Sequence, residues 1–253
     1  MIESSTYPSI RVFPSGCQDL DFLIPSIDET FLAVDQFVDR NCDKNRVELP
    51  YWTSERATLS LFAGGIWRSS ADNLVLEEYC CTKGPTDAPK GGRRDIWFVA
   101  NGKECYAEAK RADCWREVSS IAVAKIRRWI ELAATEADAA NSNSKHKSSC
   151  TALTANSNET CSSSPYPLGL VFAAPYLIQR APEEQLSVLQ LYWERTLAAC
   201  EEAHAALGCR LLWARYFRND LLGPSGYFMS PSARRWLSMP VLDIFVADRG
   251  NAD

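Results

Sequence analysis

Hydrophobic and polar positions alternate with two different periods along the chain, and these periods predict its elements. Apolar residues at helical spacing predict helices over residues 27–41, from Thr53 or Ser54 onward, over 117–133 and over 183–207. Runs rich in β-branched and aromatic residues predict strands over 73–80, 95–100, 103–111, 168–177, 209–217 and 241–248. The pair Asn101-Gly102 suits the positive φ angles of a type I′ turn, so it joins the second and third strands into a hairpin.

This order of elements predicts an α/β fold with a mixed central sheet flanked by helices. From residue 52 the order is one helix, three strands, a helix and a strand, followed by a further helix and two strands. We expect one domain over residues 1–253. It has an N-terminal helical extension over 1–51, a core over 52–178, and a C-terminal helix and strands over 179–253. Residues 135–165 are rich in Ser, Asn, Thr and Ala, and we expect them to form a flexible insertion in the core.

Composition excludes several classes of protein. With 46% hydrophobic residues, 8 Trp and 10 Phe, the chain has enough apolar material for a core and is not generally disordered. The longest apolar stretch, 168–178, is shorter than a membrane span of about 20 residues, and the start has no leader pattern. We therefore expect a cytoplasmic protein that does not contact membranes. The 10 cysteines form no C-x-x-C pair and are accompanied by 2 histidines, which favours buried free thiols over structural zinc.

Charged residues of the third strand provide the candidate chemistry. Strand alternation places Glu108 and Lys110 on one face. If the turn has two residues, Ala100 faces Lys103 and Asp95 lies opposite Glu108. Two carboxylates at short range repel each other unless a cation lies between them, and their hard oxygens select Mg²⁺ or Mn²⁺.

A lysine beside such a metal suggests hydrolysis of a phosphodiester. The lysine can orient or deprotonate a metal-held water for in-line attack on phosphorus, while the ion stabilises charge on the phosphate oxygens. Glu55, in the first turn of the preceding helix, could add a third carboxylate.

The pattern D-x12-E-x-K across a hairpin, preceded by a helix that carries Glu, resembles the PD-(D/E)xK, or restriction-endonuclease-like, nuclease superfamily. The resemblance covers residues 52–178 and implies an αβββαβ core. It implies a Mg²⁺-dependent nuclease, with Mn²⁺ as a substitute and DNA favoured over RNA. Asp95 and Glu108 would be metal ligands, the Ala109 carbonyl a further ligand, Lys110 the catalytic lysine and Glu55 the acidic residue of the helix. Because such enzymes need two active sites to cut paired strands, the resemblance also suggests a homodimer.

Local charge agrees with a polyanionic substrate. Residues 83–128 contain 11 Lys and Arg against 6 Asp and Glu, although the whole chain has a net charge of -5. A second, weaker candidate surface interleaves four arginines with four aromatic residues, although aromatic residues at such spacing more often belong to a core. Its residues are Arg215, Arg218, Arg234 and Arg235 with Trp213, Tyr216, Tyr227 and Trp236. The residues expected to contact nucleic acid are Arg93 and Arg94 in a basic loop, together with Arg111, Lys125 and Arg128.

Several alternatives stay open. A bare E-x-K is expected by chance about once in a chain this long. Glu108 and Lys110 would then be a solvated ion pair and Asp95 a residue that starts a strand. Arg127 and Arg128 would simply be the wet face of a helix. Arg94 stands where the superfamily's name has proline, and the helix after Lys110 lacks a Q-x-x-x-Y pattern. The same fold also serves as a non-cleaving module, such as an inhibitor, immunity protein or assembly subunit. An RNA-processing enzyme would share the site chemistry.

Overall fold

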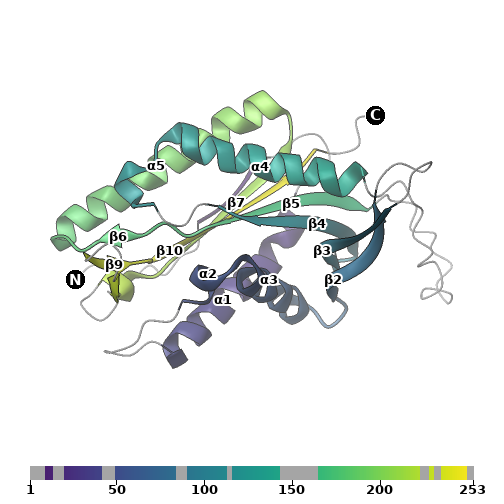
Figure 1. Ribbon diagram of the computed structural model, residues 1–253, viewed down its shortest axis with the longest axis horizontal. Coiled ribbons are helices and arrows are strands. Elements are labelled where there is room, and N and C mark those ends of the chain that lie inside the picture. The colour runs from purple at the N-terminus through teal and green to yellow at the C-terminus, as the bar shows by residue number, and fades with distance from the viewer. Residues whose placement is uncertain are drawn as a thin grey trace.

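A computed structural model describes residues 9–13, 20–41, 49–83, 90–112, 116–142, 165–222, 228–230 and 235–249. Seven strands form the central sheet in the order β1-β7-β10-β5-β4-β3-β2 (Figure 1). β4 and β5 are parallel, and the other neighbouring strands are antiparallel. The strands are β1 (Ser9–Phe13), β2 (Leu74–Lys83), β3 (Lys90–Ala100), β4 (Lys103–Arg111), β5 (Tyr166–Ala173), β7 (Arg210–Phe217) and β10 (Val241–Asp248).

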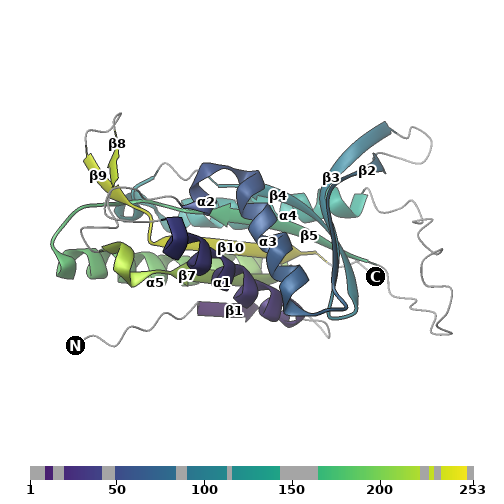
Figure 2. The same cartoon turned by 90° about the horizontal axis from the view of Figure 1, so that it is seen from below.

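Helices cover both faces of this sheet. α1 (Ile24–Asn41) and α3 (Glu55–Ser69) lie on one face, while α4 (Val123–Ser142) and α5 (Pro182–Leu207) lie on the other (Figures 1 and 2). Each face has its own hydrophobic core. Phe62 and Phe98 belong to the core under α1 and α3, and Trp129 and Trp213 belong to the core under α4 and α5. The predicted mixed sheet between helices is confirmed.

Smaller elements complete the described chain. A second sheet has the strand order β6-β9-β8 and lies at the end opposite the β2–β3 ribbon (Figure 2). The sequence patterns predicted neither this sheet nor β1. The remaining elements are β6 (Leu177–Ile178), β8 (Phe228–Ser230), β9 (Arg235–Ser238), the short helix α2 (Pro50–Thr53) and 3-10 turns at Asp21–Leu23, Val118–Ser120 and Asn219–Leu222.

The hairpin and the start of α3 follow their sequence signals closely. Asn101 and Gly102 have φ angles of 49° and 74°, as a type I′ turn requires, and Ala100 pairs with Lys103. Ser54 caps α3 because its hydroxyl accepts a hydrogen bond from the Ala57 backbone N–H at 3.0 Å. The helix therefore begins at Glu55.

The helix predicted from residue 117 begins six residues later, at Val123. Glu117 has an extended backbone and forms a parallel bridge with Tyr176. The Val118 N–H donates to the Tyr176 carbonyl at 2.9 Å, and the Tyr176 N–H donates to the Arg116 carbonyl at 3.0 Å. This pairing uses the backbone groups that a longer helix would need.

The same helix also ends later than predicted, which shortens the expected insertion. α4 continues to Ser142, so residues 135–142 are helical. Its buried stripe continues through Ala133, Ala137 and Ala140, which are fully buried. Alanine favours the helix but adds little hydrophobicity, so the pattern looked like the start of a loop. The rest of the expected insertion, residues 143–164, lies outside the described residues.

The strands β2 and β3 are longer than predicted. Their ladder continues to the pair Lys83↔Lys90, so both ends of the expected loop are strand, and residues 84–89 lie outside the described part of the chain. In Figure 2 these strands extend past the remainder of the sheet as a two-stranded ribbon. Backbone pairing across the ribbon overrides the poor strand propensity of its glycines.

Three of the eight residues of the second surface considered for nucleic acid belong to the core, while Tyr227 and Arg234 lie outside the described residues. Trp213 and Tyr216 are buried, with 0% and 3% of their surface exposed, so they cannot stack on bases. Arg215 is buried as well and binds Asp243 with two hydrogen bonds, of 2.7 and 3.0 Å.

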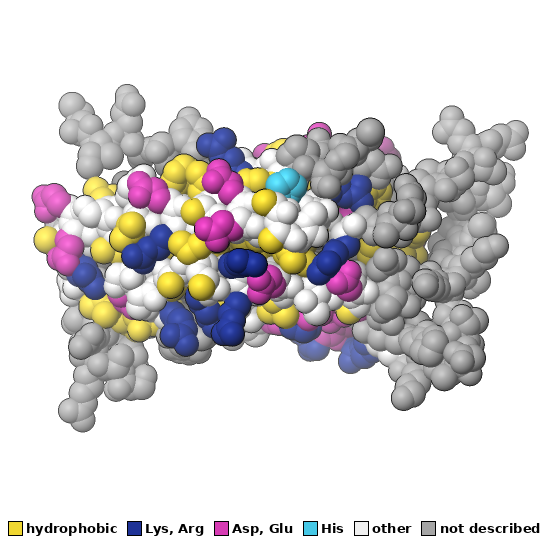
Figure 3. Space-filling view, turned by 90° about the horizontal axis from the view of Figure 1, so that it is seen from above, with side chains coloured by type: hydrophobic (Ala, Val, Ile, Leu, Met, Phe, Trp, Pro, Cys, Tyr) yellow, Lys and Arg dark blue, Asp and Glu magenta, His cyan; other side chains and the backbone are white. Residues whose placement is uncertain are grey.

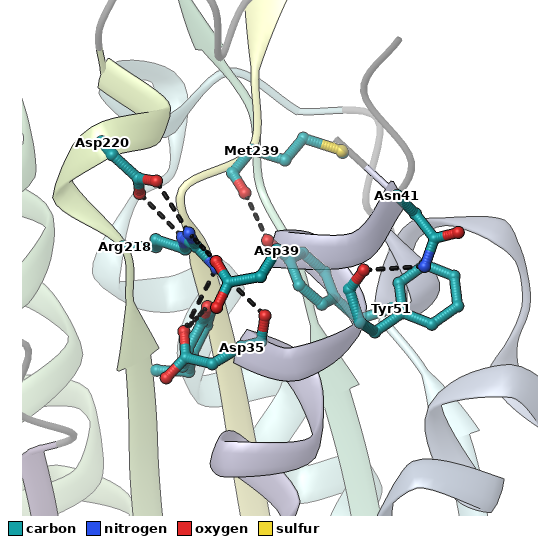
Figure 4. A network of polar contacts seen from close by, with 9 residues as sticks. Asp35, Asp39, Asn41, Tyr51, Arg218, Asp220 and Met239 are labelled. Carbon is teal, nitrogen blue, oxygen red and sulfur yellow. Dashed lines mark hydrogen bonds and ion pairs between the residues drawn. The ribbon is translucent and has the colours of Figure 1, made fainter. Parts of the chain in front are cut away.

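Arg218, another residue of that surface, ties β7 to α1. It binds Asp35 and Asp39 of α1 and Asp220 beyond β7 (Figure 4). Burial and the hydrogen bond to Asp35 raise the pKa of the Tyr216 hydroxyl, which donates to Asp35 at 2.6 Å. This cluster is a structural clamp between elements far apart in the sequence.

Candidate active site

The candidate site lies where two neighbouring strands diverge. β3 pairs with β4 from Ala100↔Lys103 to Ile96↔Ala107. The earlier residues of β3 continue along β2, whereas β4 continues along β5 to the pair Arg111↔Phe172. Asp95 is therefore the residue at which β3 leaves β4. Beyond this fork, one edge of β4 has no strand beside it among the described residues.

Two carboxylates take the place of the missing strand. The Ala109 N–H donates to Asp95 Oδ2 at 2.7 Å, and the Arg111 N–H donates to Glu55 Oε2 at 2.6 Å. Residues two apart on a strand direct their N–H groups to the same side, so both acids lie along one edge of β4. Each satisfies a backbone donor that the sheet leaves unpaired. The fold thus brings the acidic residue of α3 and the predicted aspartate to the same edge.

Lys110 lies among oxygens at this fork. Its Nζ donates to the Ala109 carbonyl at 2.7 Å and is 3.9 Å from Asp95 Oδ2. It is also 3.9 Å from Glu136 Oε2, on α4. The side chain of Lys110 is 41% exposed, that of Asp95 31% and that of Glu136 16%. The ammonium is therefore partly desolvated and reachable from solvent.

Sequence reasoning missed Glu136 as a neighbour of this lysine. Glu136 falls in the stretch interpreted as an insertion, so no helix was expected there. The available signal was the spacing of Ala133, Ala137 and Ala140, which continues the apolar stripe of the helix. Extending the helix along that stripe would have brought Glu136 onto it.

Glu108 is buried, with 6% of its surface exposed, and it pairs in register with Gly169 of β5. α4 packs closely at this point, because a Cβ on Gly169 would lie 1.7 Å from the Ala133 carbonyl oxygen. Burying a carboxylate costs free energy, and a residue that only forms an ion pair on a solvated face would stay exposed. Within the described residues, Lys110 forms ion pairs with Asp95 and Glu136. The burial of Glu108 therefore disfavours the alternative in which Glu108 and Lys110 form a solvated ion pair.

The oxygens at the fork suit a two-carboxylate metal site. Within the described ranges, no three acidic, histidine or cysteine side chains are arranged to hold a metal ion. Mg²⁺ is commonly bound by one or two carboxylates and completes its shell with waters and substrate phosphates. Asp95, Glu108 and the Ala109 carbonyl offer only hard oxygen donors. Asp95 Oδ2 and the Ala109 carbonyl already lie beside one cationic group, the Lys110 ammonium. By the chemistry of their donor atoms, these residues fit Mg²⁺ or Mn²⁺.

The arginines predicted to contact nucleic acid from a loop belong to β3 instead. Arg93 is exposed and pairs with Glu78 of β2. Glu78 also pairs with Arg56 of α3, so it faces that helix. Arg94 has only 3% of its surface exposed, and its guanidinium carbon lies 4.1 Å from the centre of the Tyr106 ring. Arg94 is therefore not part of a solvated loop.

The remaining predicted contacts are spread over two elements. Arg111 is partly buried at the end of β4, whereas Lys125 is partly buried and Arg128 exposed on α4. Arg127 pairs with Glu131 one turn along the helix. Figure 3 shows basic and acidic side chains interspersed on the α4–α5 face. That face has the charge pattern of an ordinary solvated helix. This agrees with the alternative in which Arg127 and Arg128 only form the solvent-exposed face of the helix.

Comparison of the chain with protein-family models, with curated proteins and with solved structures gives no match. Within the described part of the chain, no helix has the length and apolar character needed to cross a membrane. The geometry of the fork is therefore the feature of the molecule that bears on its function.

Proposed function

We propose that this protein is a Mg²⁺-dependent nuclease that hydrolyses phosphodiester bonds in nucleic acid, with DNA preferred over RNA and Mn²⁺ able to replace Mg²⁺. One observation carries the proposal. Asp95 of β3, Lys110 of β4 and Glu55 of α3 meet at the open edge of β4. There the Lys110 ammonium donates to the Ala109 carbonyl. This set includes a carboxylate that could bind metal, a lysine that could act on water and a third polar group that fixes the strand edge.

Each residue has a defined role in this proposal. Asp95, the buried Glu108 and the Ala109 carbonyl would hold the ion, which when bound acts as a Lewis acid and lowers the pKa of water. Lys110, as the ammonium held by the Ala109 carbonyl and Glu136, would orient the attacking water by donating to it from Nζ, while the proton of the metal-activated water would pass to solvent. Glu55 would keep the edge of β4 in place through the Arg111 amide.

The charge of residues 83–128 bears on the substrate, and the number of active sites needed to cut a duplex bears on the oligomeric state. The segment 83–128 has an excess of 5 positive charges, from 11 Lys and Arg against 6 Asp and Glu, which favours a polyanion. Cutting both strands of a duplex would require two sites and therefore a homodimer. We expect the enzyme to act in the cytoplasm.

A second candidate is a non-cleaving module on the same scaffold. The observation that favours it is the position of Lys110, whose ammonium contacts the same oxygens that a metal would need. If this contact persists in solution, the protein would bind nucleic acid or another partner without cutting. Titration calorimetry with Mg²⁺ separates the two candidates, because the module would release no heat of binding.

The nuclease proposal is tested with wild-type protein and the variants Asp95→Ala and Lys110→Ala. We would incubate each with plasmid, linear and single-stranded DNA and with structured RNA, in Mg²⁺, Mn²⁺ or EDTA. We expect wild type to cut only with metal, Asp95→Ala to be inactive, and Lys110→Ala to be about 10²–10⁴-fold slower.

Asp72→Ala is the matched control, since Asp72 is an exposed acid of the turn before β2, away from the fork. It should cleave like wild type. Circular dichroism checks that every variant is folded. Undiminished cleavage by Asp95→Ala would disprove the site, whereas a folded wild type that cuts nothing would favour the binding module.

A further inference from the structure

Arg94 is a buried charge whose partner is absent from the described part of the protein. It is 3% exposed, and its Nε and Nη1 atoms are buried without hydrogen-bond partners. No ion pair links it to any carboxylate of the described residues. Burying an unpaired guanidinium is costly, because it loses hydration without gaining a counter-charge.

The guanidinium of Arg94 has a fixed position. It stacks on the ring of Tyr106, 4.1 Å from the ring centre. The Tyr106 hydroxyl donates to Glu104 Oε1 at 3.1 Å, and Trp97 Nε1 donates to the same oxygen at 2.8 Å. A guanidinium over a ring face binds hydrogen-bond acceptors near its own plane rather than through the ring. Arg94 is therefore ready to bind an anion at its edge.

Two other arginines show how this chain normally treats a stacked guanidinium. Arg215 lies 4.4 Å from the centre of the Tyr192 ring and binds Asp243 with two hydrogen bonds. Arg210 lies 5.4 Å from the centre of the Tyr166 ring and pairs with Asp248. Each has an internal carboxylate. Arg94 differs from both, because no carboxylate of the described residues pairs with it, which leaves its edge open to a counter-ion from outside the chain.

The location of Arg94 indicates the class of that counter-ion. Asp95 follows it along β3, and Glu108 and Lys110 follow Tyr106 on the same face of β4 by strand alternation. An anion on Arg94 would lie beside the proposed cleavage site. Arginine binds phosphate oxygens through two parallel N–H groups, with geometry that lysine cannot reproduce.

We infer that Arg94 is the receptor for a backbone phosphate of the nucleic acid, adjacent to the fork. The inference rests on the proposed function for the identity of the substrate. The bound phosphate would supply the missing counter-charge, so part of the cost of burying Arg94 in the free protein is recovered when substrate binds.

The first test uses inorganic phosphate as a probe and thermal unfolding as the readout, so that it does not depend on cleavage. Methionine keeps an apolar, polarizable side chain on Tyr106 and removes the charge. We expect Arg94→Met to unfold at the same temperature as wild type or higher, and phosphate to raise the unfolding temperature of wild type alone. Chloride at equal ionic strength should raise neither.

Arg210→Met is the matched control, since it removes a stacked arginine that has its carboxylate. It should lower the unfolding temperature and keep the response to phosphate. If Arg94→Met fails to fold, Arg94→Lys provides the comparison, since it keeps the charge but loses the two-pronged contact and should respond less to phosphate. A loss of stability in Arg94→Met with an unchanged phosphate response would overturn the inference.

The second test measures binding of a DNA duplex in EDTA, where metal-dependent cleavage cannot occur. We expect Arg94→Met to bind at least about fivefold more weakly than wild type. Neutral methylphosphonate linkages should reduce wild-type binding and leave the variant's binding unchanged. A phosphate response without any cleavage would leave this inference standing and reject the nuclease. Equal DNA binding and equal cleavage by wild type and Arg94→Met would reject the inference and keep the nuclease.

Discussion

Arg215 and Arg94 both lie over aromatic rings in the interior, but among the described residues only Arg215 has a carboxylate beside it. Asp243 also accepts hydrogen bonds from Tyr192 at 2.6 Å and Trp213 at 2.9 Å. Burial lowers the pKa of the Arg215 guanidinium, and attraction by Asp243 more than offsets this, so that pKa is raised. The pair is a fully connected network, and its members depend on one another.

Removal of Asp243 should therefore be strongly destabilising. Asp243→Ala leaves Arg215, Tyr192 and Trp213 without their shared acceptor inside the core. We expect the free energy of unfolding to fall by about 3–5 kcal/mol, measured by urea denaturation at neutral pH.

Asp220→Ala makes the same chemical change beside another arginine. Asp220 is 61% exposed and shares Arg218 with Asp35 and Asp39. Its loss should cost less than about 1 kcal/mol, because solvent screens the pair. Similar losses in the two variants would show that burial does not decide the value of these ion pairs.

Among the elements, α4 and β5 make the contact that organises the fork. A Cβ at Gly169 would lie 1.7 Å from the Ala133 carbonyl oxygen and 2.7 Å from the Ala137 backbone nitrogen. Gly169 pairs with Glu108, and Glu136 on the same helix lies beside Lys110. The distance between helix and strand therefore sets the surroundings of both site residues.

Gly169→Ala should push α4 away from the sheet. We expect a loss of at least about 1–3 kcal/mol of unfolding free energy, the usual cost of overpacking, and slower cleavage because Glu136 moves relative to Lys110. Thermal unfolding and the DNA assay measure the two effects. Gly64→Ala is the control, since nothing lies within 4 Å of a Cβ there. It should stabilise α3 by up to about 1 kcal/mol. A neutral Gly169→Ala would contradict this account of the packing.

Local patterns predicted most elements and part of the site, whereas non-local pairing was beyond them. The turn at Asn101-Gly102 and the cap at Ser54 depend on a few adjacent residues, so the hairpin register and the position of Glu55 were predictable. The fork was not, because it depends on β5, some 60 residues from β4, taking the other edge of that strand. Arg94 was missed as a core residue, since its burial depends on stacking with Tyr106 from the next strand.

At the scale of the whole molecule, the two cores contain ionisable groups that the fold keeps neutral. Cys105, Cys200 and Cys209 are buried free thiols, as the cysteine spacing suggested. Burial is the largest cause of the raised pKa of the Cys200 thiol, followed by repulsion from Asp243. Burial and Asp243 also raise the pKa of the Tyr192 hydroxyl well above its ordinary value.

These shifts predict that the folded state weakens in alkali. The Cys200 thiol ionises near its ordinary pKa of 9.0 only after unfolding, so its contribution is complete below that pH and is lost as pH rises above it. Each such group adds about 1.4 kcal/mol of loss per pH unit, because the unfolded chain releases a proton that the folded protein retains. Urea denaturation between pH 8 and 10.5 (roughly one unit either side of thiol ionisation) measures the slope. Cys200→Ala should reduce the slope of unfolding free energy against pH by about 1.4 kcal/mol per pH unit, even if it also changes the stability at pH 8. An unchanged slope would mean that this thiol ionises in the folded protein.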